Sequence, residues 1–109
     1  MVKAYFRPSS LEEALELLGR EKEARLLAGG SYLLSPQFKE TPMSAIAISG
    51  LLPHSVERKK DTIIIGAGIC FQDLADSKLA PEALKQAALG MANRNVRNRA
   101  TVGGNIGAD

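Results

Sequence analysis

Residues 26–31 read Leu26-Leu27-Ala28-Gly29-Gly30-Ser31, and residues 101–106 read Thr101-Val102-Gly103-Gly104-Asn105-Ile106. Each stretch sets a glycine pair beside a hydroxyl or amide side chain. Because glycine has no Cβ, backbone N–H groups in such a loop can approach a ligand closely and turn toward one point. A concavity of this kind binds anions, phosphate above all. Either pair alone is typical of an ordinary turn, but together they predict two loops that share the two phosphates of a pyrophosphate.

The length and composition fit one small domain with a real core, because 45% of the 109 residues are hydrophobic. The net charge of +2 is too balanced to favour nucleic acid or an anionic membrane as a partner. The single cysteine, Cys70, excludes an internal disulfide. The sequence shows no secretion signal and no apolar run of about 18 residues, the length of a transmembrane helix. We therefore expect a cytoplasmic protein.

The hydrophobic pattern predicts short strands interleaved with helices. We expect strands over residues 4–6, 24–28, 45–48, 55–60 and 62–65. The second and third of these are apolar runs of the kind found in buried strands, and the fourth suits a sheet edge or a hairpin arm. We expect further helices over 71–75, extending at most to 78, and from Pro81 onward. This order indicates α/β or α+β, and we adopt α+β: a small sheet with helices packed on it.

The first helix is the one that the sequence specifies most fully. Ser9 or Ser10 is placed to cap it, because each has a glutamate three residues later, the spacing of a capping box. Gly19 fits the left-handed position that ends many helices. The spacing i, i+3, i+4, i+7 predicts an inward face formed by Leu11, Ala14, Leu15 and Leu18. The helix opened by Pro81 has a corresponding face, formed by Leu84, Ala87, Ala88 and Met91.

Residues 93–109 show no helical or strand period and predict an extended loop that carries the second glycine pair. Within it, Arg94, Arg97 and Arg99 form a local basic excess. We interpret most of these side chains as a solvated loop surface, with at least one arginine giving favourable potential near a diphosphate. Binding of nucleic acid is a distant alternative, since no aromatic side chain lies nearby in the sequence to stack on a base.

The stretch Gly66-Ala67-Gly68 follows the strongest strand signal and invites comparison with a Rossmann dinucleotide site. That fingerprint requires a third glycine at position 71, where this chain has Phe71. The fingerprint's acidic residue at the end of a further strand is also missing. We therefore interpret residues 66–68 as a structural turn after a core strand.

The chain offers no group for acid–base or nucleophilic chemistry. His54 has no partner at metal-ligand spacing, and the acidic residues are scattered over helix faces. We therefore assign no catalytic and no metal-binding residues. Any reaction chemistry must come from a cofactor.

Three stretches together resemble the FAD-binding subunit of molybdenum hydroxylases, a family that includes xanthine dehydrogenase, carbon monoxide dehydrogenase and related aldehyde oxidoreductases. They are Ala28–Ser31, Ile65–Gly68 and, most specifically, Val96–Ile106. The opening Phe6-Arg7-Pro8, followed by the SLEEALELL helix, is similar too. The resemblance covers essentially the whole chain. It implies the N-terminal subdomain of a PCMH-type (vanillyl-alcohol-oxidase) FAD-binding fold.

The resemblance also implies which residues bind the cofactor, since the two glycine loops of that family grip the FAD pyrophosphate. Carried over, the first loop comprises Leu27, Ala28, Gly29, Gly30, Ser31, Tyr32 and Leu33. The second comprises Thr101, Gly103, Gly104 and Asn105. Met91 falls near a position that packs by the adenine. Tyr32 departs from the family, in which a smaller or acidic side chain is usual.

In the family, electrons pass from a molybdopterin cofactor through [2Fe–2S] clusters, both on partner subunits, to the flavin and then to NAD or another acceptor. Family subunits are more than twice as long as this chain, so we expect only the N-terminal, pyrophosphate-binding part, inactive alone and with weak affinity for FAD. A homo-oligomer is possible. The alternative is a truncated, non-enzymatic remnant that serves as an assembly or interaction module.

Overall fold

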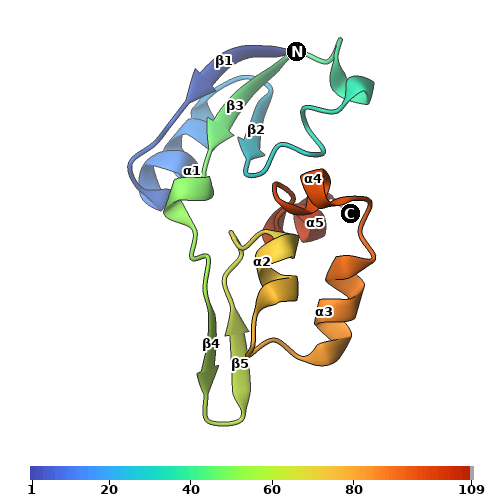
Figure 1. Ribbon diagram of the computed structural model, residues 1–109. Helices are drawn as coiled ribbons and strands as arrows, with labels where there is room; N and C mark the ends of the chain where they lie inside the picture. Colours follow the sequence, from blue (N-terminus) through green and yellow to red (C-terminus); the bar gives the residue numbers. More distant parts are fainter. Residues whose placement is uncertain (109) are drawn as a thin grey trace. The chain divides into compact units, whose positions relative to one another are not determined.

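The computed structural model describes residues 1–108, which form two compact units: Met1–Leu51, and the residues from Leu52 onward. We describe each unit by itself (Figure 1). Both combine strands and helices, so the expected α+β class is confirmed, but the strands form two small sheets and not the single sheet that we expected. None of the helices within residues 1–108 is long and apolar enough to cross a membrane.

The first unit is a three-stranded parallel sheet with one helix. Its elements are β1 (Val2–Phe6), α1 (Leu11–Arg20), β2 (Ala24–Leu27) and β3 (Met43–Ala47), with single 3-10 turns η1 (Pro36–Phe38) and η2 (Ser49–Leu51). The strand order is β1-β3-β2, so β3 is central, and Met43, Ala45 and Ile46 are its buried residues. A parallel strand hydrogen-bonded on both sides is expected to be apolar throughout, and the prediction for residues 45–48 is confirmed.

Strand β2 forms as expected but is not buried. It is an edge strand in the order β1-β3-β2, and Arg25 and Leu26 in its middle are exposed. A run of four or five apolar residues cannot by itself distinguish a central strand from an edge strand. The prediction of a strand at residues 24–28 is therefore confirmed, but the prediction that this strand is buried is wrong.

Helix α1 begins with the capping box that the sequence predicts. The Ser10 hydroxyl accepts from the Glu13 N–H at 3.1 Å, while the N–H and hydroxyl of Ser9 donate to the Glu13 carboxylate at 2.8 and 2.9 Å. These bonds from Ser9 lower the pKa of Glu13. Because its folded-state pKa lies below the unfolded value, the contact stabilises the fold above the unfolded pKa and loses that contribution as the pH falls through the folded pKa.

The inward face and the end of α1 differ from the sequence prediction. The buried residues are Ala14 and Leu17, whereas Leu11, Leu15 and Leu18 are 51%, 67% and 37% exposed. Two neighbouring apolar faces at helical spacing can be drawn on this helix, one through Leu17 and one through Leu18. The helix buries the face that contains Leu17. Gly19 lies inside the helix, which continues to Arg20 and ends with Glu21 in an extended conformation.

Replacing Ser10 with Ala should lower the free energy of unfolding by about 1 kcal/mol, because the N–H of Glu13 loses its capping acceptor. Urea unfolding monitored by circular dichroism measures the loss. Ser10→Thr, which retains a capping hydroxyl, is the control and should keep most of the stability. Equal stability of the Ala and Thr variants would show that this cap does not stabilise the helix.

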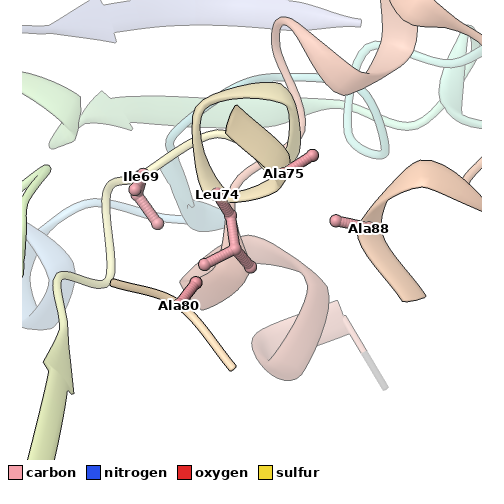
Figure 2. Close-up of a cluster of buried hydrophobic side chains, with 5 residues drawn as sticks. All are labelled: Ile69, Leu74, Ala75, Ala80 and Ala88. Atoms are coloured by element: carbon pink, nitrogen blue, oxygen red, sulfur yellow. The ribbon is translucent and has the colours of Figure 1, made fainter. Parts of the chain in front are cut away.

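The second unit has a β-hairpin followed by short helices. The hairpin pairs β4 (Val56–Lys59) with β5 (Thr62–Ile65), which confirms both strand predictions. The helices are α2 (Phe71–Asp76), α3 (Glu82–Leu89), α4 (Arg94–Arg97) and α5 (Val102–Ala108). Figure 2 shows the core of this unit, in which buried side chains from α2, α3 and the loops before them gather: Ile69, Leu74, Ala75, Ala80 and Ala88.

Helix α3 exposes most of the face that the sequence placed inward. Ala88 is buried, but Leu84 and Ala87 are exposed, and the helix ends at Leu89, before Met91. With only eight residues, α3 presents little more than two turns. Its contact with α2 therefore depends mainly on one small residue, Ala88, which permits close approach.

The extended loop expected over residues 93–109 is wrong for the described part, which holds α4 and α5. Both helices are too short to show a hydrophobic period, and each is defined by its cap instead. The Asn93 side chain accepts from the Val96 N–H at 3.0 Å, and the Thr101 hydroxyl accepts from the Gly104 N–H at 3.0 Å. The second glycine pair therefore lies in the first turn of a helix.

Candidate functional site

The first glycine loop, residues 27–33, begins at the end of β2 and continues into a helical turn. Gly30 has a φ of 76°, in the left-handed region that favours glycine. Its carbonyl accepts from the Leu34 N–H at 3.0 Å, which closes the turn. Within the described residues, the N–H groups of Ser31, Tyr32 and Leu33 donate to no acceptor. The first turn of a helix leaves N–H groups of this kind available for an anion.

Two side chains brace this turn from its far end. The N–H and hydroxyl of Ser35 both donate to the Tyr32 carbonyl, at 3.1 and 2.6 Å. The Tyr32 ring meets the Phe38 ring edge to face, with centroids 4.9 Å apart. The tyrosine that departs from the family pattern is therefore used in packing against η1. The backbone N–H of Tyr32 is left open by these contacts.

The second glycine loop, residues 101–105, has its N–H groups occupied. The N–H of Val102 donates to Ile69, and that of Gly103 to Ala67, at 3.1 and 2.9 Å. The N–H groups of Gly104 and Asn105 donate to the hydroxyl and carbonyl of Thr101, each at 3.0 Å. This loop therefore differs from the open N–H concavity that the sequence suggests. It presents Gly104 and the Asn105 side chain to solvent, with Thr101 buried at 6% exposure.

The glycines of residues 66–68 and 103 let three backbone segments stack. A Cβ on Gly66 would lie 2.3 Å from the Pro53 carbonyl oxygen, and one on Gly103 would lie 2.9 Å from that of Ala67. The Ile69 N–H donates to the Gly66 carbonyl at 3.1 Å, so residues 66–69 form a turn. The interpretation of this stretch as a structural turn is thereby confirmed, but the strand before it, β5, is a partly exposed hairpin strand and not a core strand. The turn also supports the second glycine loop.

Replacing Gly66 with Ala should destabilise the chain by about 1–3 kcal/mol, because the new methyl group would overlap a backbone carbonyl that cannot move independently. Gly19→Ala is the matched control, since a Cβ there meets nothing within 4 Å and the site is helical. The control should gain about 0.5–1 kcal/mol. Thermal unfolding of the two variants side by side gives the comparison, and a neutral Gly66→Ala would contradict the stacking.

The arginines of residues 94–99 have separate roles in the second unit. Arg94 is exposed, as the sequence predicts for a solvated surface. Arg97 instead donates to the Gln72 side chain and to the carbonyls of Leu89 and Met91. These contacts could not be predicted from the sequence, because the partners lie 6 to 25 residues away along the chain.

Titratable side chains do not converge anywhere in the described part of the chain. Within residues 1–108, no group of three or more His, Cys, Asp or Glu residues is placed to hold a metal ion. Among residues 1–108, the pKa that is shifted is that of Glu13, which is lowered by its contacts at the start of α1, outside both glycine loops. The two glycine loops remain the best candidates for a ligand-binding site.

The whole of this sequence, residues 1–109, matches the family described as the FAD binding domain in molybdopterin dehydrogenase. The chain belongs to that family. The carbon monoxide dehydrogenase medium chain of Hydrogenophaga pseudoflava is 36% identical over 110 residues, covering 94% of this chain and 38% of the relative. An uncharacterized protein of Escherichia coli K12, YgfM, is 38% identical over 109 residues, covering 99% of this chain and 42% of the relative.

Solved structures give the same result. The chain aligns with carbon monoxide dehydrogenase from H. pseudoflava at a TM-score of 0.83 and 38% identity, over 94% of this chain and 38% of that one. It aligns with quinoline 2-oxidoreductase from Pseudomonas putida 86 at a TM-score of 0.82 and 25% identity, over 93% of this chain and 38% of that one. The chain thus spans about two fifths of the length of the relatives that it matches.

Proposed function

We propose that this chain is the N-terminal, pyrophosphate-binding subdomain of a flavoprotein subunit and that residues 27–33 and residues 101–105 are FAD-binding loops. The observation that carries the proposal is the row of open N–H groups on Ser31, Tyr32 and Leu33, in a turn shaped by the positive φ of Gly30. Such donors fit the phosphate oxygens of FAD. Family membership makes FAD the ligand to test first.

The two loops would contribute differently. The first offers backbone N–H groups and the exposed Ser31 hydroxyl. The second, whose N–H groups are occupied, offers the exposed Asn105 amide and the exposed backbone of Gly104, while Gly103 lets the loop pack against Ala67. Glycine at an exposed helical turn lets a ligand approach the backbone closely. We therefore expect the first loop to carry most of the interaction with phosphate charge.

The flavin, when bound, would supply the redox chemistry. In the complete assembly, we propose that electrons reach the flavin from molybdopterin and iron–sulfur partner subunits and leave to NAD or another acceptor. The residues described here would bind and orient the cofactor. We expect the isolated chain to be inactive.

Titration of FAD fluorescence with the purified chain tests the proposal. We expect quenching with a dissociation constant weaker than about 1 µM, because few contacts beyond the pyrophosphate are available. ADP, which carries a pyrophosphate, should reverse the quenching, and riboflavin, which lacks one, should not. Tightly bound yellow flavin in the purified chain would contradict the expected weakness, and competition by riboflavin would contradict the assignment to phosphate.

A second role, as an assembly or interaction module, is favoured by the exposed leucines of α1: Leu11, Leu15 and Leu18. An exposed apolar stripe at helical spacing is a common docking surface. The titration separates the two roles. A folded chain that does not quench FAD at any concentration would favour the module.

A further inference from the structure

Arg97 is the most connected charged side chain described in the second unit. Its Nε donates to the Gln72 side-chain oxygen at 3.0 Å, and one terminal nitrogen donates to the carbonyls of Met91 and Leu89 at 3.0 and 3.4 Å. One guanidinium thus joins α4 to α2 and to the end of α3. Its planar fork of donors allows several acceptors to be met at fixed angles.

The acceptor Gln72 is held in place from its other end. It is only 5% exposed, and its amide nitrogen donates to the Asp76 carboxylate at 3.2 Å. A buried amide whose donor and acceptor are both satisfied has a fixed orientation. Ala92, directly after the acceptor Met91, has a φ of 28°, which is unusual for a residue other than glycine.

Next to the contact between Arg97 and Gln72, backbone hydrogen bonds connect the residues before Gln72 to the second glycine loop. The Phe71 N–H donates to the Ala100 carbonyl at 3.0 Å, Cys70 and Thr101 form an isolated bridge, and the Val102 N–H donates to Ile69. Residues 69–72 and 97–102 therefore run past each other as a short row of contacts. The side-chain contact between Arg97 and Gln72 lies at one end of this row, and the second glycine loop begins at the other end with Thr101.

We propose that Arg97 is a positioning residue for the segment 101–105. It acts through Gln72 and the carbonyls of residues 89 and 91, and its charge is committed to these contacts. The consequence for FAD rests on the proposed function: the segment must be held in place before it can contact the cofactor. This differs from a direct electrostatic role near the diphosphate, which the sequence left open for at least one arginine.

Conservative substitutions separate the two roles. Arg97→Lys keeps the positive charge and loses the fork, whereas Gln72→Leu keeps the arginine and removes its acceptor. If Arg97 positions the segment, both variants should disturb residues 102–104. If Arg97 acts only through its charge, neither variant should disturb them. The paired change Gln72→Glu with Asp76→Asn retains an acceptor for Arg97 and a hydrogen bond between residues 72 and 76, and should rescue. Arg94→Lys, at an exposed site in the same helix, is the matched surface control.

The first measurement needs no ligand: amide hydrogen exchange at Val102, Gly103 and Gly104 by NMR. We expect about tenfold faster exchange in Arg97→Lys and Gln72→Leu, which corresponds to the loss of a hydrogen bond to a charged group. Arg94→Lys and the pair Gln72→Glu with Asp76→Asn should match the parent protein. Ala80→Gly, in the same buried core but away from the acceptors of Arg97, controls for a general loss of stability. Unchanged exchange in Arg97→Lys, or equal acceleration in Ala80→Gly, would overturn the proposal.

The second measurement adds FAD and records its affinity and the phosphorus NMR signals of its pyrophosphate. Arg97→Lys and Gln72→Leu should each weaken binding about tenfold and shift the bound phosphorus signals, with Ala80→Gly unchanged when measured well below its unfolding temperature. If the parent protein does not bind FAD, the proposed function fails and the exchange measurement still decides the role of Arg97. Normal FAD binding by both variants would overturn the link to the cofactor.

Discussion

Gly30→Val should abolish the quenching of FAD fluorescence. Gly30 has a φ of 76°, and a β-branched residue at positive φ is a genuine conformational outlier. The left-handed conformation costs about 1–2 kcal/mol for an ordinary residue, and valine is among the least tolerant. The turn after residue 30 would have to change, and with it the direction of the N–H groups of Ser31, Tyr32 and Leu33. If this conformational cost, roughly 1.4 kcal/mol, is taken from the binding free energy, the affinity for FAD falls at least about tenfold.

Two further variants make this result specific. Gly30→Asn should retain most of the binding, because asparagine adopts positive φ more readily than other residues with a Cβ. Gly50→Val adds the same side chain in the same unit, at a glycine where a Cβ meets nothing within 4 Å, and should bind FAD normally. Identical titrations for Gly30→Val and the parent protein would remove the first loop from the site.

The strands and the start of α1 could be predicted because their signals are local. Ser10 and Glu13 lie three residues apart, and the run Thr62–Ile65 is short, β-branched and bounded by turn residues. Such patterns depend on the immediate neighbours of each residue. The structure accordingly places a cap at Ser10 and a hairpin strand at residues 62–65.

Burial was harder to predict, because it depends on contacts between distant residues. Leu17 and Leu18 are chemically equivalent in sequence, and the packing of α1 on its sheet decides which is buried. Likewise, β2 is apolar apart from Arg25 but lies at an edge because β3 inserts between it and β1. Helices α4 and α5 were missed because four and seven residues are too few to establish a helical period.

The candidate site shows the same division between local and distant information. The glycines at 30 and 103 are both evident in the sequence, yet their physical roles differ: one supports a positive φ, and the other permits contact with Ala67. A sequence motif cannot reveal whether its N–H groups are open or occupied. The partners of Val102 and Gly103 at Ile69 and Ala67 are more than thirty residues away along the chain.

Gly103→Val should be strongly destabilising, in contrast to a change at its neighbour. A Cβ on Gly103 would lie 2.9 Å from the Ala67 carbonyl oxygen and 3.1 Å from the Ala67 Cβ. Valine would therefore push the two backbone segments apart and break the hydrogen bond from the Gly103 N–H to the Ala67 carbonyl. Overpacking of this kind costs about 1–3 kcal/mol or more, which is a large part of the 5–15 kcal/mol that stabilises a typical domain. Urea unfolding measures the loss.

Gly104→Ala is the matched comparison, because its Cβ would meet a side-chain atom, the Thr101 hydroxyl, at 2.8 Å. That hydroxyl can rotate away at the expense of the cap, so we expect a loss of about 1 kcal/mol in stability. FAD affinity should fall further than this loss explains, since the methyl group occupies the exposed backbone that a ligand would approach. Gly104→Ala with normal FAD affinity, together with a stable Gly103→Val, would leave the second loop with neither its packing role nor its place in the site.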